Sequence, residues 1–474
     1  MTTGRARSNA LETPASRAAA ELSPSSWRTA SALVIAALGV GLLGCGPVDD
    51  VGTGEDFASE GPPLAYEEYQ VLFTNPVCDL YEYGPDQEVY SVAGERLLAK
   101  PKDAFCTKAD AEASGARPES PQHKMVEWIQ DPSTEHVFFA ALSFSNSVIQ
   151  EELCRAVTER SVKVEFVMDR DSDLTKANRL LACQPASGDP ADAPELHLRG
   201  KEGNISLHHN KLFLFNPYSD RVRIAFGSGN VSSGLVLHHE NWHFVTVPSS
   251  THFAQAHQCM REGLIEHGHS KGDYSEYVNA CRASIEPKEE SDMKTFFVPG
   301  DGGSGTNTII KAIDRAEAID IAAHRYTHST HVKRIRRRFE NPNPPALRFV
   351  GDDDLYWAGQ GEIVGGNEPF EYDHVQSLVA LGMQERYVET NHGAHLLHHN
   401  KVYIFTMPEE QPSGVFCGAG NFTKSAFRDN YENFYYVTIP HVVEAFRAQY
   451  DHLFNTLATE PPNLPAQNVL PPQG

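Results

Sequence analysis

The chain has 474 residues, of which 40% are hydrophobic and 22% are charged, and it carries a formal net charge of −23 at pH 7. This length allows two domains of ordinary size, and the composition is that of a globular protein, which excludes a disordered or fibrous chain. The negative charge disfavours binding to a polyanion such as DNA over a large surface, although it leaves room for a small basic pocket.

The first 44 residues have the layout of an export signal. Four arginines precede an apolar run at residues 30–43, which is shorter than a membrane-spanning helix requires. The run leads into Leu-Leu-Gly-Cys at Cys45, which resembles a bacterial lipobox, whose cysteine is lipidated. We expect a lipoprotein signal peptide at 1–44, lipidation at Cys45 and a flexible tether at 45–61; an ordinary signal peptide or a short membrane anchor is the alternative. The protein would then be exported and lipid-anchored to the bacterial cell envelope, at the outer membrane or on the periplasmic face.

Export would place the eight cysteines in an oxidising compartment, where most of those other than Cys45 should pair. Connectivity cannot be deduced from sequence. Proximity along the chain suggests the pairs Cys78–Cys106, Cys154–Cys183 and Cys259–Cys281. Cys417 is left over, and we expect it to be a buried thiol.

Helical and strand-like segments alternate from about residue 120. In chain order we predict a helix from 120, a strand at 136–144, a helix from 146, a strand at 162–169, a helix at 174–183, strands at 196–198 and 207–215, two more strands, and a helix at 251–267. The same order then recurs. It comprises a helix at 306–316, a strand at 319–326, helices and strands at 330–339, 347–354, 375–383 and 397–406, two more strands, and a helix at 441–455.

This order indicates an α/β protein with two lobes, each a mixed sheet flanked by helices. We place the N-terminal lobe at 62–285, an inter-lobe linker at 286–306, the C-terminal lobe at 307–460 and a disordered tail at 461–474. Two equivalent lobes related by a pseudo-two-fold axis would face each other, with one active site between them.

One stretch occurs twice, as LHHNKLFLFN at 207–216 and as LHHNKVYIFT at 397–406. Each copy is followed by a glycine-rich turn that ends in asparagine, GSGN at Asn230 and GAGN at Asn421. After each glycine-rich turn, a glutamate and an asparagine precede an aromatic strand, and the two glutamates are Glu240 and Glu432. A single His-x-Lys would be noise, but two ordered copies of His, Lys, Asn and Glu indicate a duplicated catalytic unit.

Alternate residues of a strand share a face, so His209 projects with Lys211 and His399 with Lys401. Two facing histidines can divide displacement at phosphorus: one attacks, and the other protonates the leaving oxygen and later activates water. The lysines and the amides of Asn230 and Asn421 suit binding and stabilisation of phosphoryl oxygens. Glu240 and Glu432 could each accept an imidazole N–H and fix its tautomer. This scheme uses no metal and no other cofactor. The alternative for one copy alone is a strand-terminal histidine beside a solvated lysine.

The paired pattern resembles the phospholipase D superfamily, whose motif is His-x-Lys followed by Asp and then by Gly-Ser/Gly-x-Asn. The resemblance covers about 120–455 and implies two α/β lobes around a shared site, with His209 as the nucleophile and His399 as the proton donor. The sequence departs from the motif at its aspartate, since Asn216 and Thr406 stand at that position. This aspartate is generally structural in the family, so we expect its loss to affect local packing more than the chemistry. The His-Lys-Asn set with a downstream glutamate also looks like the compact nuclease branch.

We therefore expect a phospholipase D-like phosphodiesterase, a phosphoric diester hydrolase that works through a phosphohistidine. The expected substrate is a phospholipid, which would lose its headgroup to give phosphatidic acid, or another phosphodiester. The lipid anchor would bring the protein to a membrane, nucleic acid is a less favoured partner, and we expect a monomer. The alternatives are a metal-independent endonuclease of the same superfamily and a non-catalytic binding protein.

Three other features have simpler interpretations. The acidic groups at 169–173 and 352–354 fall at equivalent strand ends, where we favour loop solvation or cleft lining over a cation site. His208 and His398 should point away from the motif histidines and serve in packing or at the rim. The basic run at 333–338 is interpreted as a solvated helix face.

Overall fold

The computed structural model describes residues 61–76, 88–90, 96–98, 106, 108–359, 369–390 and 397–461. Contacts divide the chain into Met1–Glu55, which lies outside these ranges, and Asp56–Gly474, which contains every element described below. The expected signal peptide, the lipidation site Cys45 and nearly all of the expected tether and tail therefore lie outside the described residues. Within the described ranges, no helix combines the length and the apolar character that a membrane crossing needs.

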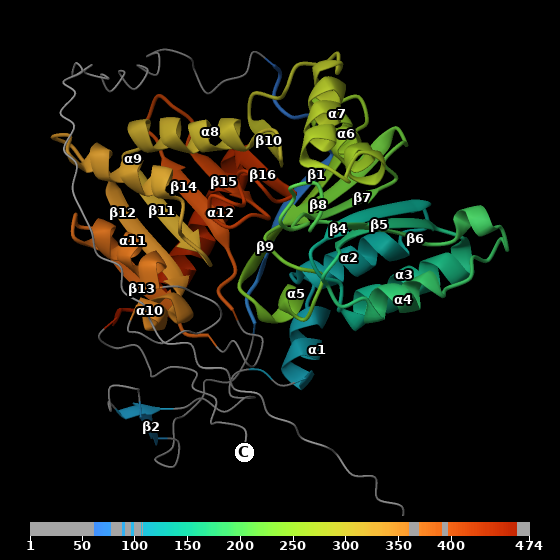
Figure 1. Ribbon diagram of the computed structural model, residues 1–474, viewed down its shortest axis with the longest axis horizontal. Helices are drawn as coiled ribbons and strands as arrows, with labels where there is room; N and C mark the ends of the chain where they lie inside the picture. The colour runs from blue at the N-terminus through green and yellow to red at the C-terminus, as the bar shows by residue number, and fades with distance from the viewer. Residues whose placement is uncertain are drawn as a thin grey trace, which may run out of the picture. The chain divides into compact units, whose positions relative to one another are not determined.

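The first lobe is built on a mixed sheet, which within the described residues has seven strands in the order β1-β9-β8-β7-β4-β5-β6 (Figure 1). β4, β5 and β6 are parallel, and the other neighbours are antiparallel. The strands are β1 (Glu68–Thr74), β4 (His136–Ala141), β5 (Lys163–Asp169), β6 (Glu195–Arg199), β7 (Lys211–Phe215), β8 (Arg221–Gly227) and β9 (Glu240–Pro248). The helices are α1 (Lys108–Ala116), α2 (Pro121–Gln130), α3 (Ser147–Arg160), α4 (Thr175–Leu181), α5 (Gly234–Leu237), α6 (His252–Glu266) and α7 (Lys271–Ala283), and β2 (Glu88–Tyr90) pairs with β3 (Arg96–Leu98) separately.

The second lobe repeats this plan with the strand order β10-β16-β15-β14-β11-β12-β13, and the described residues add β17 at the far edge. The strands are β10 (Met293–Val298), β11 (Ala318–Ala323), β12 (Ala346–Asp352), β13 (Gln384–Val388), β14 (Lys401–Thr406), β15 (Gly414–Gly418), β16 (Glu432–Val437) and β17 (Ala458–Thr459). The helices are α8 (Gly302–Arg315), α9 (Ser329–Phe339), α10 (Asp353–Gly359), α11 (Pro369–Val379) and α12 (Pro440–His452). Strand for strand, each sheet matches the other, so the predicted two-lobe α/β fold is confirmed.

Several helices begin where a polar side chain caps the first turn. Ser120 accepts a hydrogen bond from the backbone N–H of Gln122, and proline follows it at the first helical position of α2. Asn146 accepts from the N–H of Ile149 at the start of α3. Thr251 does the same for α6. These caps explain why the starts of these helices could be placed from the sequence.

The structure differs from the expected linker at 286–306. This stretch holds β10, an edge strand that pairs with β16, and the first residues of α8, so the second lobe begins near Met293. The expectation failed because the short apolar run of β10 stands among charged and glycine residues. Likewise α7 was not predicted, since only Tyr274 and Val278 of its residues are buried and its apolar stripe is weak. The helix expected at 375–383 begins and ends earlier, as α11.

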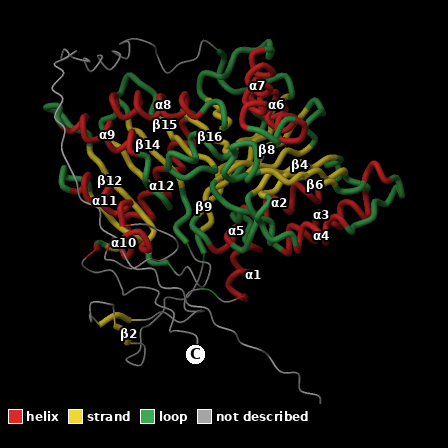
Figure 2. Tube along the Cα trace, viewed as in Figure 1, coloured by secondary structure: helices red, strands yellow, loops and turns green. Residues whose placement is uncertain are grey.

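Alternating side chains of the central strands sort into separate cores. On β7, Leu212 and Leu214 join a cluster that includes α6 and α7, and this cluster continues into the second lobe through Val402 and Ile404. Phe213 points the other way, against α2, α3 and α4. A third cluster lies between the second sheet and α8, α9 and α11. Figure 2 shows the strands of both sheets set among these helices. One apolar core is therefore shared by the two lobes.

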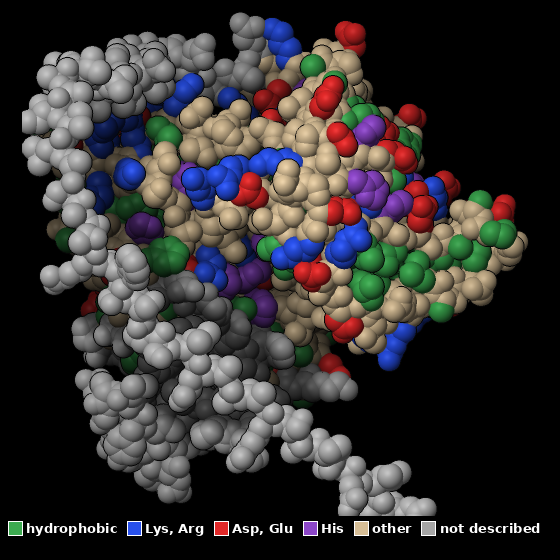
Figure 3. Space-filling model, in the orientation of Figure 1, with side chains coloured by type: hydrophobic (Ala, Val, Ile, Leu, Met, Phe, Trp, Pro, Cys, Tyr) green, Lys and Arg blue, Asp and Glu red, His purple; other side chains and the backbone are tan. Residues whose placement is uncertain are grey.

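The basic run at 333–338 lies on α9. Lys333, Arg336 and Arg337 are exposed, and Arg334 pairs with Asp314 of α8. Figure 3 shows Lys and Arg side chains on this part of the second lobe. The interpretation as a solvated helix face is confirmed.

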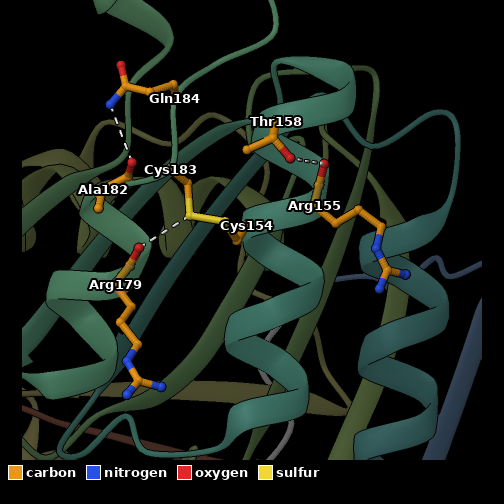
Figure 4. The surroundings of a disulfide bond; sticks show 7 residues. All are labelled: Cys154, Arg155, Thr158, Arg179, Ala182, Cys183 and Gln184. Carbon is orange, nitrogen blue, oxygen red and sulfur yellow. Dashed lines mark hydrogen bonds between the residues drawn. A yellow bond between two sulfur atoms is a disulfide. The ribbon is translucent and has the colours of Figure 1, made fainter.

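Two of the suggested cysteine pairs are present among the described residues. Cys154 of α3 is bonded to Cys183, just after α4 (Figure 4), and Cys259 of α6 to Cys281 of α7. Cys417 on β15 is a buried free thiol, as expected. Cys78 lies outside the described residues, so its suggested pairing with Cys106 stays a prediction.

Removing the bridge between α3 and α4 should lower stability. It closes a loop of 29 residues, and such a cross-link restricts the unfolded chain enough to stabilise by about 3 kcal/mol. Cys154→Ser combined with Cys183→Ser should lower the free energy of unfolding by about that amount in urea denaturation. A reductant that cleaves only this bridge should lower the free energy of unfolding of the native protein and leave that of the double variant unchanged. Equal stability of the oxidised native protein and the double variant would contradict this expectation.

Candidate active site

The two His-His-Asn turns before β7 and β14 are each held by the opposite lobe. The backbone N–H of His209 donates to the carbonyl of Tyr431 at 2.9 Å, and the N–H of Tyr431 donates to the carbonyl of Leu207 at 2.8 Å. In the second copy, the N–H of His399 donates to the carbonyl of His239 at 3.1 Å. Both contacts are short parallel bridges between a motif and the segment before the other lobe's glutamate.

A strand-end aspartate fixes each turn from within its own lobe. Asp169 at the end of β5 accepts the backbone N–H of His208 at 2.7 Å, and Asp352 at the end of β12 accepts that of His398 at 2.8 Å. Both aspartates are buried, so the expectation of loop solvation or cleft lining is wrong for them. It holds for Asp171, which is exposed. The need to pair a buried backbone N–H explains the difference.

The motif histidines pair with glutamates of the opposite lobe. His209 Nδ1 lies 2.8 Å from Glu432 Oε2, and His399 Nδ1 lies 2.7 Å from Glu240 Oε1. All four side chains are buried. A glutamate that accepts the Nδ1–H leaves Nε2 unprotonated, which is the form that a nucleophile or base requires. The sequence predicted glutamates in this role but did not say which histidine each would serve.

The motif lysines lie against the histidines of their own strands. Lys211 Nζ is 3.2 Å from His209 Nε2 and donates to the carbonyl of His209 at 3.0 Å. Lys401 Nζ donates to the carbonyl of His399. Burial lowers the pKa of Lys211 to about 8, although Glu432 and Glu240 oppose this shift. Burial also lowers the pKa of Lys401, again against the attraction of Glu240.

The two glycine-rich turns bring an asparagine to the same region. Asn230 and Asn421 each have a buried Oδ1 without a hydrogen-bond partner among the described residues. The third residue of each turn must be glycine, because a Cβ on Gly229 would lie 2.6 Å from the Nε1 of Trp242, and one on Gly420 would lie 2.2 Å from an atom of the Phe434 ring. A Cβ at these two glycines would also lie 3.2 Å from Glu240 Cδ and 3.1 Å from Glu432 Cδ, so each turn passes close to a glutamate.

The two glutamates differ electrostatically. Burial raises the pKa of Glu432 to about 8, against the opposing effects of Lys211, Asn430 and Lys401. Burial would also raise the pKa of Glu240, but the charge and hydrogen bond of His399, together with His238 and Lys401, lower it below its ordinary value. Glu240 additionally accepts the hydroxyl of Ser228 at 2.6 Å. Glu240 is therefore the more firmly ionised carboxylate of the two.

Burial keeps both motif histidines neutral in the free protein. It lowers the pKa of His399 to about 3, against the attraction of Glu240. It lowers the pKa of His209 too, with Lys211 and Lys401 acting in the same direction. An anionic phosphodiester placed between the two rings would raise both pKa values and favour protonation of one ring.

Sequence reasoning missed four residues of this site. Asn241 donates to Asn400 at 2.8 Å, and Asn433 accepts the backbone N–H of Lys211 at 3.0 Å, so both amides hold the opposite motif. The repeated Glu-Asn pair was the available signal for them. The rings of His238 and His324 lie 5.6 Å and 4.8 Å from that of His399, centroid to centroid. Neither has a histidine counterpart in the other lobe, so the repeat gave no signal.

The remaining motif positions serve in packing. His208 and His398 are fully buried, as expected for packing residues. Asn216 accepts the backbone N–H groups of Glu135 and His136 at 2.8 and 3.0 Å, and so holds the start of β4. In the first lobe this asparagine occupies the position of the superfamily aspartate and makes local backbone contacts.

Comparison with known proteins gives the following result. No protein-family model matches the chain, and no curated protein is similar to it. Solved structures do share its fold. A phosphatidylserine synthase of Haemophilus influenzae Rd KW20 is 12% identical, with 71% of this chain and 84% of that chain covered and a TM-score of 0.49. A yeast tyrosyl-DNA phosphodiesterase is 10% identical, with 66% and 85% covered and a TM-score of 0.43.

A third solved structure matches a smaller part of the chain. The phospholipase D family member Nuc of Salmonella typhimurium is 19% identical, with 35% of this chain and 96% of that chain covered and a TM-score of 0.27.

Glu432→Gln should change how stability depends on pH. Because burial raises the pKa of Glu432 from 4.5 to about 8, the unfolded chain has released this proton between these values while the folded protein has kept it. The free energy of unfolding therefore falls as pH rises through that window, by up to roughly 1.4 kcal/mol per pH unit from this group. The variant cannot titrate at this position and should lose this decline, which urea unfolding at several pH values would measure.

Glu240→Gln is the matched control. The pKa of Glu240 is lowered by folding, so its contribution to stability is present above 4.5 and does not change at higher pH. When the difference in free energy of unfolding from the native protein is plotted against pH, it should be constant above pH 4.5 for Glu240→Gln and should change with pH for Glu432→Gln. Parallel curves for the native protein and Glu432→Gln would contradict the assignment.

Proposed function

We propose that this chain is a phospholipase D-type phosphodiesterase that cleaves its substrate through a phosphohistidine on His209. The observation that carries the proposal is the reciprocal pair of buried His–Glu contacts, at 2.8 and 2.7 Å, with a lysine from each lobe beside them. Two imidazoles with their Nδ1–H groups engaged by carboxylates present two Nε2 atoms for chemistry.

In the first step, His209 Nε2 attacks phosphorus and the bond from phosphorus to the leaving oxygen breaks. A proton on His399 Nε2 passes to that oxygen, so the product leaves as an alcohol. In the second step, water gives a proton to His399 and its oxygen bonds to phosphorus. The P–N bond then breaks and His209 is restored. Substitution of an alcohol for water would give transfer instead of hydrolysis.

The different surroundings of the two rings favour this division of roles. Lys211 Nζ lies 3.2 Å from His209 Nε2, and a cation at that atom disfavours its protonation, as a nucleophile requires. His399 faces Glu240, whose ionised carboxylate favours an imidazolium, as a proton donor requires. Lys211 and Lys401, with the amides of Asn230 and Asn421, would bind the phosphoryl oxygens and stabilise the charge that develops on them.

We further propose a phospholipid substrate, with headgroup release and a phosphatidic acid product. This is supported by the lipobox-like sequence at Cys45, which would hold the protein at a membrane of the cell envelope, and by a net charge of −23, which disfavours long nucleic acids. We also propose that the protein acts as a monomer, because both motifs that complete the site belong to one chain.

The first test compares two substrate classes. The purified full chain, in detergent and EDTA, would be given phosphatidylcholine vesicles and single-stranded DNA in parallel. We expect headgroup release from the vesicles that falls by roughly 10²–10⁴-fold in His399→Asn, the range for loss of a general acid or base. His209→Asn should be inactive. His267→Asn, a ring stacked on Tyr277 away from the motifs, is the matched control.

Each other outcome has a definite meaning. DNA cleavage with untouched vesicles would identify an endonuclease of the same fold and reject the lipid proposal. If the protein turns over neither substrate while circular dichroism shows that it is folded, the chain would be better described as a non-catalytic binding protein.

The roles of the two histidines are tested by trapping. Acid-quenched protein incubated with a phosphorus-labelled substrate should carry the label on His209. The label should accumulate in His399→Asn, because the second step lacks its base. Label found on His399 in the native protein would reverse the assignment.

A further inference from the structure

The two His–Glu pairs have different third neighbours. Two positions before Glu432 stands Asn430, whose Nδ2 donates to Glu432 Oε1 at 2.9 Å. Two positions before Glu240 stands His238, whose Nδ1 is 3.4 Å from Glu240 Oε1. His238 is 7% exposed, and its Nδ1 has no hydrogen-bond partner among the described residues. The second catalytic ring, His399, thus shares its glutamate with another buried imidazole.

His238, Glu240 and His399 form a compact cluster of donor atoms. One ligand atom of each lies within 4.8 Å of the others, and all three side chains are buried. Two imidazoles and one carboxylate make the ligand set of many zinc sites that keep an open fourth position. Ligands at 2.0–2.1 Å from a tetrahedral ion stand roughly 3.3 Å apart, and the measured contacts of 2.7 Å and 3.4 Å to Glu240 Oε1 lie on either side of that spacing.

We propose that His238, Glu240 and His399 bind a Zn²⁺ ion that inhibits the protein. The ion would bind the Nδ1 lone pair of neutral His399 and Glu240 Oε1, and the ring proton that stood between these two atoms would then stand on Nε2. A water molecule or a phosphate oxygen would fill the fourth position. Because the ligands come from both lobes, the ion would also link the lobes at the site.

Inhibition follows from what the ion removes, and this part rests on the proposed function. Metal-bound neutral His399 carries its one ring proton on Nε2, so this nitrogen has no lone pair with which to accept a proton from water. That N–H is also a much weaker acid than the N–H of an imidazolium, so His399 would fail both as the proton donor to the leaving oxygen and as the base of the second step. The half of the site around His209 lacks a third ligand, since Asn430 replaces the histidine, and no such cluster is found there among the described residues.

The direct test measures binding without any substrate. The full chain, stripped with EDTA and dialysed, would be titrated with Zn²⁺ by calorimetry and with Co²⁺ by visible absorption, in which a tetrahedral His/carboxylate site gives d–d bands. We expect one tight site per chain. His238→Asn, which copies the other half, should weaken Zn²⁺ binding by at least the ~100-fold that loss of an outer partner of a metal ligand can cause.

The reciprocal variant tests the same geometry by gain. Asn430→His would supply the missing ligand beside Glu432 and His209 and should raise the stoichiometry from one ion to two. It also keeps the proposal testable if His238→Asn fails to fold. Equal Zn²⁺ affinity in the native protein and folded His238→Asn, no saturable site in the native protein, or unchanged stoichiometry in Asn430→His would each overturn the site.

The inhibitory role has its own readout. Hydrolysis of whichever phosphodiester the native chain cleaves would be measured in EDTA and in excess Zn²⁺, and the ratio compared within each protein. We expect a ratio of at least ten for the native chain and near one for His238→Asn. Equal ratios, or stimulation by Zn²⁺, would overturn inhibition. If the native chain cleaves no phosphodiester, the proposed function fails while the binding experiments still decide the metal site.

Discussion

Each motif histidine contacts a glutamate that the other lobe supplies. The contacts from His209 to Glu432 and from His399 to Glu240 give each buried glutamate a hydrogen-bond partner, and a buried carboxyl group without a partner is strongly disfavoured. Each motif histidine therefore takes its glutamate from the opposite lobe. A shared apolar core contains Leu214 of the first lobe and Ile404 of the second. This core and the cross-lobe amide contacts hold the two lobes in the register that the His–Glu contacts require.

The local scaffold of each half is arranged to keep the motif backbone still. Asp169 and Asp352 occupy the ends of equivalent strands and accept the N–H group just before each motif histidine. Asn216 fixes the far end of the first motif strand. These backbone contacts position the histidine rings but do not touch the reacting atoms. Groups that are already in position stabilise the charge of a transition state more strongly than groups that must first reorganise.

The sequence was sufficient to predict the duplicated order of strands and helices and two disulfides, because each depends on spacing or on local periodicity. The motif histidines, lysines and glutamates that it singled out do contact one another. It could not predict the exchange of glutamates. Glu240 is nearer in sequence to His209 than to His399, and no spacing rule says that it would serve the distant ring. β10 was missed because six residues in a charged stretch give little periodicity. His238 was missed because the second copy has Asn430 at the equivalent position, and the repeat identifies only residues that both copies share.

That difference bears on why the two halves occupy one chain. A pair of identical subunits around a two-fold axis would have identical His–Glu contacts, so nucleophile and acid could differ only in the order in which substrate meets them. Joining the copies allows Asn430 and His238 to stand at equivalent positions, so the two glutamates have different neighbours. Because the contacts are reciprocal, a substitution of either glutamate removes the carboxyl partner of a ring in the other lobe. Covalent fusion therefore allows the two halves to differ in their neighbours while each still depends on the other.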